Sequence, residues 1–337
     1  MENNKRNHTL DALKVFSAIM IILVHFPFEG ELGHICSNIG ICGVILFFLI
    51  SGYSSYNSDN EIACSNILRR FKRNGITLLI VLLIYFIFAI IFMLFDGNNI
   101  FYRFKDPWRI PRILLLGDFS FMKGDPLWFM VVLLWGYLIL YLLHKFKAIK
   151  IGYILLPLLL LFRIFVECYV NTYNTDWHYS SFFLASGVPI MMLGSFIACK
   201  KEAFLKAPLY VTIILTIIST ALMFVFIHVK VFNYDIAQIF KIWCMLEIFI
   251  LALKLPREKE VPALSKLGRT YSAYIYLFHF VIVMVVLYLS YLIGCPYWFY
   301  DWVMPIIAVI AGVTGSILLY MANNAIKNKI NNNKQES

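Results

Sequence analysis

The chain has 337 residues, of which 61% are hydrophobic and only 14% are charged, and its formal net charge is +10 at pH 7. A soluble globular domain carries about 25% charged residues, so this composition, with a mean hydropathy of +0.78, excludes an ordinary soluble protein and indicates an integral membrane protein. Lysine and arginine in cytoplasmic loops explain the positive charge. Because no basic patch is interleaved with aromatics in a polar domain, we expect no nucleic-acid partner.

Apolar runs long enough to cross about 30 Å of hydrocarbon recur along the chain. They predict ten spans, at residues 10–28, 38–56, 75–95, 126–144, 152–170, 181–199, 208–227, 236–254, 271–293 and 301–322. Lipid offers no partner to unpaired backbone groups, and the runs lack strand-like alternation, so each span is predicted to be a helix. The first run is interpreted as a retained helix, because no cleavage pattern follows it. The predicted fold is an all-α polytopic membrane bundle in one domain over residues 1–337, with a polar tail from about residue 323.

The loop charges predict the orientation of the bundle. With the N-terminus inside, twenty lysines and arginines fall in inner segments and six in outer segments, which are Arg103, Lys105, Arg109, Arg112, Lys123 and Lys230. This positive-inside bias predicts that both termini are cytoplasmic. The longest outer connection, residues 96–126, is long enough to suggest a functional loop. The seven cysteines form no CxxC pair, so we expect neither a zinc site nor a disulfide framework, and no metal.

The first run contains ionisable residues at helical spacing. Asp11 and Lys14 are three residues apart and are expected to pair across one turn. Lys14 and His25 are eleven residues apart, so they share one face of a helix at a separation of about 16 Å. Ionisable groups in a bilayer are costly and normally face a bundle interior or cavity. A catalytic interpretation makes His25 a general base and Lys14 a charge in the inner half of a pore; the alternative is a core histidine and a snorkelling lysine.

Three further groups of residues are candidates for chemistry. Ser51 and Gly52 end the second run and allow close helix approach, with Tyr53 beside them. The cluster Arg69–Arg73 precedes the third run and is suited to phosphates of a nucleotide-like donor, or to anionic lipid and topology alone. Ionisable residues also lie deep in later spans, and each has a bundle-fastening alternative: Arg163 and Glu167, which are expected to form an ion pair, Lys241, Glu247, His279 and Asp301.

Taken together, these segments resemble acyltransferase family 3, the membrane O-acyltransferases of bacterial surface glycans. Lys14 and His25 match the family's Arg/Lys-x10-His motif, and Arg70 and Arg73 match its Arg-x-x-Arg. The segments Phe47–Tyr53, Pro126–Met130 and Tyr271–His279 resemble its other motifs. The chain departs from the family pattern in having lysine at the first motif and two serines after Tyr53. No hydrolase-like extracellular domain is expected after the last span, so transfer is completed in the membrane domain or by a separate protein.

The resemblance implies transfer of an acyl group, acetyl by default and succinyl as the alternative, from cytoplasmic acyl-CoA to a hydroxyl of an extracytoplasmic glycan or lipid-linked sugar. It implies a multi-pass protein of the bacterial cytoplasmic membrane. The catalytic residues are then His25, Lys14 and Asp11. Acetyl-CoA is assigned to Arg69, Arg70, Arg73, Ser51, Tyr53 and His279, the last at a membrane depth away from His25. The acceptor is assigned to Trp128, Glu167, Trp108 and Trp177.

Two other classes of protein share part of this pattern. A secondary transporter or flippase also uses membrane-embedded charges, often at broken helices. The absence of paired Gly- or Pro-interrupted spans in the two halves argues against that class. A non-catalytic membrane sensor, or the membrane module of a split resistance system, would not need the imidazole of His25.

Overall fold

A computed structural model describes residues 7–96, 106–229, 231, 236–257 and 261–335, and no β-strand occurs among them. Eight of the described helical stretches are long and apolar enough to cross a membrane. They run through α1 (His8–His25), α2 (Gly30–Tyr53), α3 (Asn60–Asp96), α5 (Trp128–Lys145), α6 (Ile149–Tyr173), α9 (Leu209–His228), α12 (Ser272–Leu292) and α13 (Met304–Gln335). The all-α polytopic prediction is confirmed. Of the cations used to predict orientation, Arg103, Lys105 and Lys230 are among those outside the described residues.

Two of the ten predicted spans form helices that are not among these eight long apolar helices. The segment predicted at 236–254 is α10 (Ala237–Lys254), which carries three charged residues, Lys241, Glu247 and Lys254. The segment predicted at 181–199 is wrong in its first turn and a half, because α7 begins at Gly187 and ends at Cys199. At about 1.5 Å per residue, this helix is only about 20 Å long. The carbonyls of Ala185 and Ser186, just before α7, accept hydrogen bonds from Arg163. This segment is therefore held by Arg163 and does not extend the helix toward residue 181.

The third helix is longer than its apolar run. It was predicted at 75–95, but α3 starts at Asn60, where the Asp59 carboxylate accepts hydrogen bonds from the backbone N–H groups of Glu61 and Ile62. A carboxylate at this position satisfies N–H groups that have no partner within the helix. The basic cluster Arg69–Arg73 therefore lies within α3, where the sequence predicted a segment before the helix.

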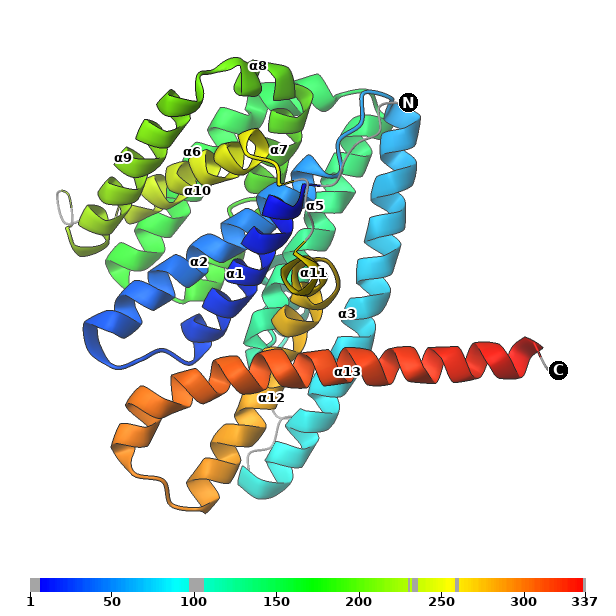
Figure 1. Cartoon of the computed structure of the whole chain (residues 1–337), viewed down its shortest axis with the longest axis vertical. Coiled ribbons are helices and arrows are strands. Elements are labelled where there is room, and N and C mark those ends of the chain that lie inside the picture. The colour runs from blue at the N-terminus through cyan, green and yellow to red at the C-terminus, as the bar shows by residue number, and fades with distance from the viewer. Residues whose placement is uncertain (1–6, 97–105, 230, 232–235, 258–260, 336–337) are drawn as a thin grey trace. The chain divides into compact units, whose positions relative to one another are not determined.

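The described residues form two compact units, and the boundary between them falls inside α2. The terminal unit comprises Met1–Val44 and Pro256–Ser337, and contains α1, the first part of α2, α11 (Pro262–Lys266), η5 (Leu267–Tyr271), α12, η6 (Phe299–Val303) and α13. In this unit α12 packs along α13, and α1 packs against both of them (Figure 1). Its core includes Ala18, Ile22, Ile275, Val283 and Ala308.

The central unit comprises Ile45–Leu255 and contains the remaining helices. Besides α3, α5, α6, α7, α9 and α10, these include α4 (Arg109–Leu116), η2 (Ser120–Met122), η3 (Asp125–Leu127), η4 (Trp177–Ser181) and α8 (Lys201–Lys206). In this unit α3 packs on α5, α9 on α10, and α7 on both α5 and α6.

Two glycines bring the end of α2 against α7. A Cβ at Gly52 would collide with the backbone carbonyl of Met191, and one at Gly194 would collide with the carbonyl of Leu49. Each glycine thus faces the backbone of the other helix, as in the small-residue contacts of membrane helices. The predicted close approach at Gly52 is confirmed.

Candidate functional site

The N-terminal half of α1 holds a small charged cluster. Asn7 caps the helix by accepting a hydrogen bond from the Thr9 N–H. Asp11 is buried, and its carboxylate lies 3.4 Å from the Lys14 ammonium, as the spacing predicted. His8 Nδ1 also lies 3.8 Å from Asp11 and 3.0 Å from the Ser265 hydroxyl, contacts that the sequence analysis missed. Lys14 is therefore one member of a paired cluster at the N-terminal end of α1.

His25 is the last residue of α1, and its ring lies against α12. The centroids of the His25 and His279 rings are 5.4 Å apart, with the planes tilted by 35°, and the Phe280 ring meets His25 edge-on at 5.3 Å. His279 is fully buried, whereas His25 is partly exposed. The two histidines thus lie side by side in the terminal unit.

The prediction that His279 lies at a different membrane depth from His25 is wrong. The apolar run suggested a span starting at residue 271, which would place His279 in its inner half. Instead, the helical path begins at Pro262 and continues through the π-helical turn η5 into α12. These nine extra residues add about 13 Å at the N-terminal end, at about 1.5 Å per residue, so His279 lies near the middle of the longer path.

The predicted donor-binding residues of α2 and α3 all belong to the central unit, where Arg70 contacts the end of α2. The guanidinium of Arg70 donates a hydrogen bond to the Ser54 hydroxyl at 2.9 Å, and the hydroxyls of Ser54 and Ser55 reach the carbonyl of Ser51. Arg69 and Arg73 are exposed, while Arg70 is partly buried. Ser54 is the link that the sequence analysis missed, although the pair of serines after Tyr53 marked it as unusual.

Tyr53 and Trp128 are held by aromatic neighbours in the central unit. The Tyr53 ring packs edge-on against Phe249, at 5.4 Å between centroids. Trp128 begins α5, with its ring 6.3 Å from that of Phe48. Gly117, in a left-handed conformation with φ 68°, lies so close to Trp128 that a Cβ would collide with its backbone. Both rings thus have positions set by packing.

Glu167 and Arg163 form the ion pair that their spacing predicted. The two side chains are 3.6 Å apart on α6, and both are largely buried. Arg163 also donates hydrogen bonds to the carbonyls of Ala185 and Ser186, at 3.1 and 3.0 Å. These contacts favour a structural role for Arg163, since they attach α6 to the segment before α7.

An ionic network, called here the outer-loop network, joins α4 and the residues after it to the start of η4. Arg112 donates to the carboxylates of both Asp118 and Asp176, and His178 lies between the same two carboxylates. Burial opposes ionisation of Asp118, but hydrogen bonds from Ser120 and Arg112 outweigh it and lower the pKa of Asp118. The pKa of Asp176 falls to about 2 because hydrogen bonds from Arg112 and His178 outweigh its burial. The sequence analysis did not predict this network.

The two predicted acceptor tryptophans differ in their surroundings. Trp108, before α4, is 70% exposed. Trp177 is 44% exposed, and its ring stacks on His178 at 3.9 Å between centroids. Trp108 therefore has free ring surface, whereas one face of Trp177 belongs to the outer-loop network.

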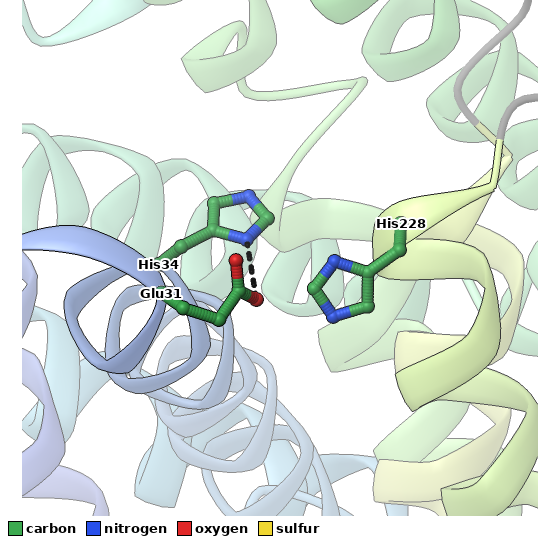
Figure 2. A group of neighbouring side chains, drawn as sticks. All are labelled: Glu31, His34 and His228. Atoms are coloured by element: carbon green, nitrogen blue, oxygen red, sulfur yellow. Dashed lines mark ion pairs between the residues drawn. The ribbon is translucent and has the colours of Figure 1, made fainter.

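The start of α2 carries an exposed carboxylate beside an exposed histidine. Figure 2 shows Glu31 and His34 with the His34 ring turned toward the carboxylate, at 3.9 Å between Nδ1 and Oε1. Both side chains are exposed to solvent. Glu31 in the first turn is also favourable for the helix dipole, so the pair is explained by local helix stability.

Comparison with known proteins supports the resemblance found in the sequence. The family model described as an acyltransferase domain, Acyl_transf_3, matches residues 7–321 and so spans both units. No curated protein and no solved structure matches the chain. Because the match covers nearly the whole chain, from α1 through most of α13, the protein belongs to acyltransferase family 3 and is a multi-pass membrane acyltransferase.

Proposed function

We propose that the protein is an O-acyltransferase that moves an acyl group, acetyl by default, from cytoplasmic acyl-CoA to a hydroxyl of an extracytoplasmic glycan or lipid-linked sugar. The observation that carries this proposal is the position of His25, at the end of the Lys-x10-His motif and beside the buried imidazole of His279. An imidazole is suited to proton transfer near neutral pH. The proposed location is the bacterial cytoplasmic membrane.

In the proposed reaction His25 acts as a general base. A neutral ring nitrogen takes the proton of the acceptor hydroxyl as that oxygen attacks the thioester carbonyl carbon. The new C–O bond forms, the C–S bond breaks, and the proton is returned from His25 to the CoA thiolate. General-base assistance of this kind contributes about 10²–10⁴-fold in rate.

The donor is proposed to bind through the group at the end of α2 and on α3. Guanidinium groups bind phosphates with paired hydrogen bonds, and Arg70 and Arg73 lie one turn apart on α3 with Arg69 beside them. The Ser54 hydroxyl links the guanidinium of Arg70 to the carbonyl of Ser51. A cationic group at the inner end of the bundle fits a donor made in the cytoplasm.

The acceptor is proposed to contact aromatic and acidic groups of the central unit. An exposed ring such as Trp108 offers an apolar face of the kind on which sugars stack, and Trp177 offers one remaining face. Trp128 and Glu167 are proposed to contact the acceptor nearer the membrane. The charge of Glu167 is already balanced by Arg163, which favours a hydrogen-bonding role for this carboxylate.

Membranes containing His25→Ala test the proposal with radiolabelled acetyl-CoA and extracted surface glycan. Loss of label transfer by about 10²-fold or more is expected, as for removal of a general base. His34→Ala, an exposed histidine of the same unit, is the matched control and should transfer label normally. Transfer at the wild-type rate by His25→Ala would remove the base role, and solute movement without an acylated product would indicate a transporter.

A further inference from the structure

The His279 ring has one nitrogen in use and one without a partner. Its Nδ1 lies 2.9 Å from the Ile275 carbonyl and 2.8 Å from the Tyr276 carbonyl. Carbonyl oxygens only accept hydrogen bonds, so Nδ1 carries the hydrogen and Nε2 carries the lone pair. Within the described part of the chain, the buried Nε2 has no hydrogen-bond partner. Buried acceptors in native proteins are almost always satisfied, so this one requires an explanation.

The imidazole of His25 is close enough to donate the missing hydrogen bond to Nε2 of His279. With their centroids 5.4 Å apart, two imidazoles that turn a nitrogen toward each other bring those nitrogens to about 3 Å, a hydrogen-bonding distance. Phe280 packs edge-on against the His25 ring and limits its rotation. Gly312 lets α13 pack closely against α1 and α12 beside the two histidines. A Cβ at this position would lie 3.2 Å from the Cβ of His279 and 3.0 Å from the side chain of Ile22.

We propose that His279 is a positioning residue for His25. Its Nε2 accepts a hydrogen bond from a ring N–H of His25. The other nitrogen of His25 then keeps its lone pair for the acceptor hydroxyl. This inference rests on the proposed function, in which His25 is the base, and it replaces the assignment of His279 to donor binding. When His25 takes up the proton, its bond to His279 becomes charge-assisted and therefore stronger.

A neutral imidazole partner fits the surroundings of this pair. On α1 the nearest charged side chain, Lys14, is about 16 Å along the helix from His25, and α13 carries no ionisable charge between Met304 and Ile326. On α12 the Tyr276 ring is 6.2 Å from His279. Glu29, Glu31, His34 and Asp301 lie on the neighbouring turns of the terminal unit, but in the described residues none of them bonds to either ring. Among the described residues of α1, α12 and α13, no carboxylate is therefore in place to position the ring of His25.

Two amide substitutions separate this role from a structural one. In His279→Gln the side-chain amide reaches the position of Nε2 and can accept from His25. In His279→Asn the amide reaches only the position of Nδ1, so it keeps the backbone hydrogen bond and loses the acceptor. We expect kcat for acetyl transfer to fall by about 10–100-fold in His279→Asn and to recover partly in His279→Gln, with KM for acetyl-CoA unchanged in both.

The pH profile provides a readout that a packing role would not change. A partner that accepts from the protonated ring favours protonation of His25, so its loss should shift the acid limb of kcat to lower pH in His279→Asn. Greater activity in His279→Asn than in His279→Gln, or a rise in KM alone, would overturn the proposal. Wild-type activity in His279→Asn together with an inactive His25→Ala would overturn it while leaving the base role intact. An active His25→Ala would instead refute the proposed function.

If the amide variants do not accumulate in membranes, a pair of glycine substitutions addresses the same contact. Gly312→Ala crowds His279 directly, whereas Gly315→Ala on the same helix crowds the side chain of Ile282 at 3.0–3.1 Å. The proposal predicts a lower kcat and a displaced acid limb for Gly312→Ala only. Equal kinetics for the two variants would overturn it.

Discussion

Arg70 donates a hydrogen bond to Ser54 at 2.9 Å, and this contact joins the basic segment of α3 to the end of α2. It holds one guanidinium of the Arg-x-x-Arg pair in place while Arg73 remains exposed. An ordered cation beside a helix end is a better phosphate ligand than a freely moving one, because less side-chain entropy is lost on binding.

Substitution of Arg70 by alanine should therefore weaken donor binding more than it slows the chemical step. We expect KM for acetyl-CoA to rise by about 10-fold, equivalent to about 1.4 kcal/mol, with a smaller change in kcat. Lys201→Ala, an exposed cation of the same unit, is the charge control and should leave KM unchanged. Steady-state kinetics in membranes measure both, and an unchanged KM for Arg70→Ala would assign the cluster to topology or lipid contact.

Substitution of Asp11 by asparagine should destabilise the terminal unit. Asp11 is buried and 3.4 Å from Lys14, so removing its charge leaves an ammonium in the bundle without that counter-charge. Removing one member of a buried ion pair costs about 3–5 kcal/mol. Lys14 is partly exposed, so we expect a loss of roughly half that, about 1.5–2.5 kcal/mol. Thermal unfolding in detergent measures the loss.

The double variant Asp11→Asn/Lys14→Met is the control for that prediction. It removes both charges and should recover part of the lost stability, because no unpaired ammonium remains. Additive losses in the cycle would show that the two side chains stabilise the helix independently.

Substitution of Gly52 by alanine should disrupt the contact of α2 with α7. The new Cβ would collide with the Met191 carbonyl, a backbone atom that cannot rotate away. Overpacking costs about 1–3 kcal/mol, and a backbone clash belongs at the upper end of that range. Gly75→Ala in α3 meets no atom within 4 Å and should be neutral or stabilising by up to about 1 kcal/mol. Equal melting temperatures for the two variants would contradict the prediction.

The outer-loop network should lose stability in acid. The pKa values of Asp118 and Asp176 are both lower in the folded protein than the ordinary value of about 3.9. Their contribution is therefore fully present above about pH 4 and is lost as pH falls through the folded pKa, which for Asp176 is about 2. Asp118→Asn should reduce this acid dependence and lower stability at pH 7.

Fluorescence of Trp177, which stacks on His178, reports on this segment while pH is varied. Asp106→Asn is the control, because Asp106 lies outside the network and caps the backbone at Trp108. If the acid transition were equally large in Asp118→Asn and in the wild type, the Asp118 carboxylate would not be its cause.

Much of the fold was predictable because hydropathy reflects the cost of putting polar groups into lipid. The long apolar runs and their helical form follow from that cost, and eight of the ten were found as long apolar helices. The late start of α7 was not predictable from its apolar run, because Arg163, more than twenty residues away in sequence, donates hydrogen bonds to the carbonyls of Ala185 and Ser186. The early start of α3 was signalled locally by Asp59 and was missed because the residues after it are polar.

For the candidate site, sequence spacing alone determined what one helix can bring together: the Asp11–Lys14 pair, the shared face of Lys14 and His25, and the Arg163–Glu167 pair all follow from 3.6 residues per turn. Only the tertiary structure placed His279 against His25 and Ser54 against Arg70. Those contacts depend on how far each helix continues past its apolar run and on which glycines let helices close on one another. Both contacts join segments that are distant in the chain, and hydropathy and spacing along a single helix do not encode how such segments pack.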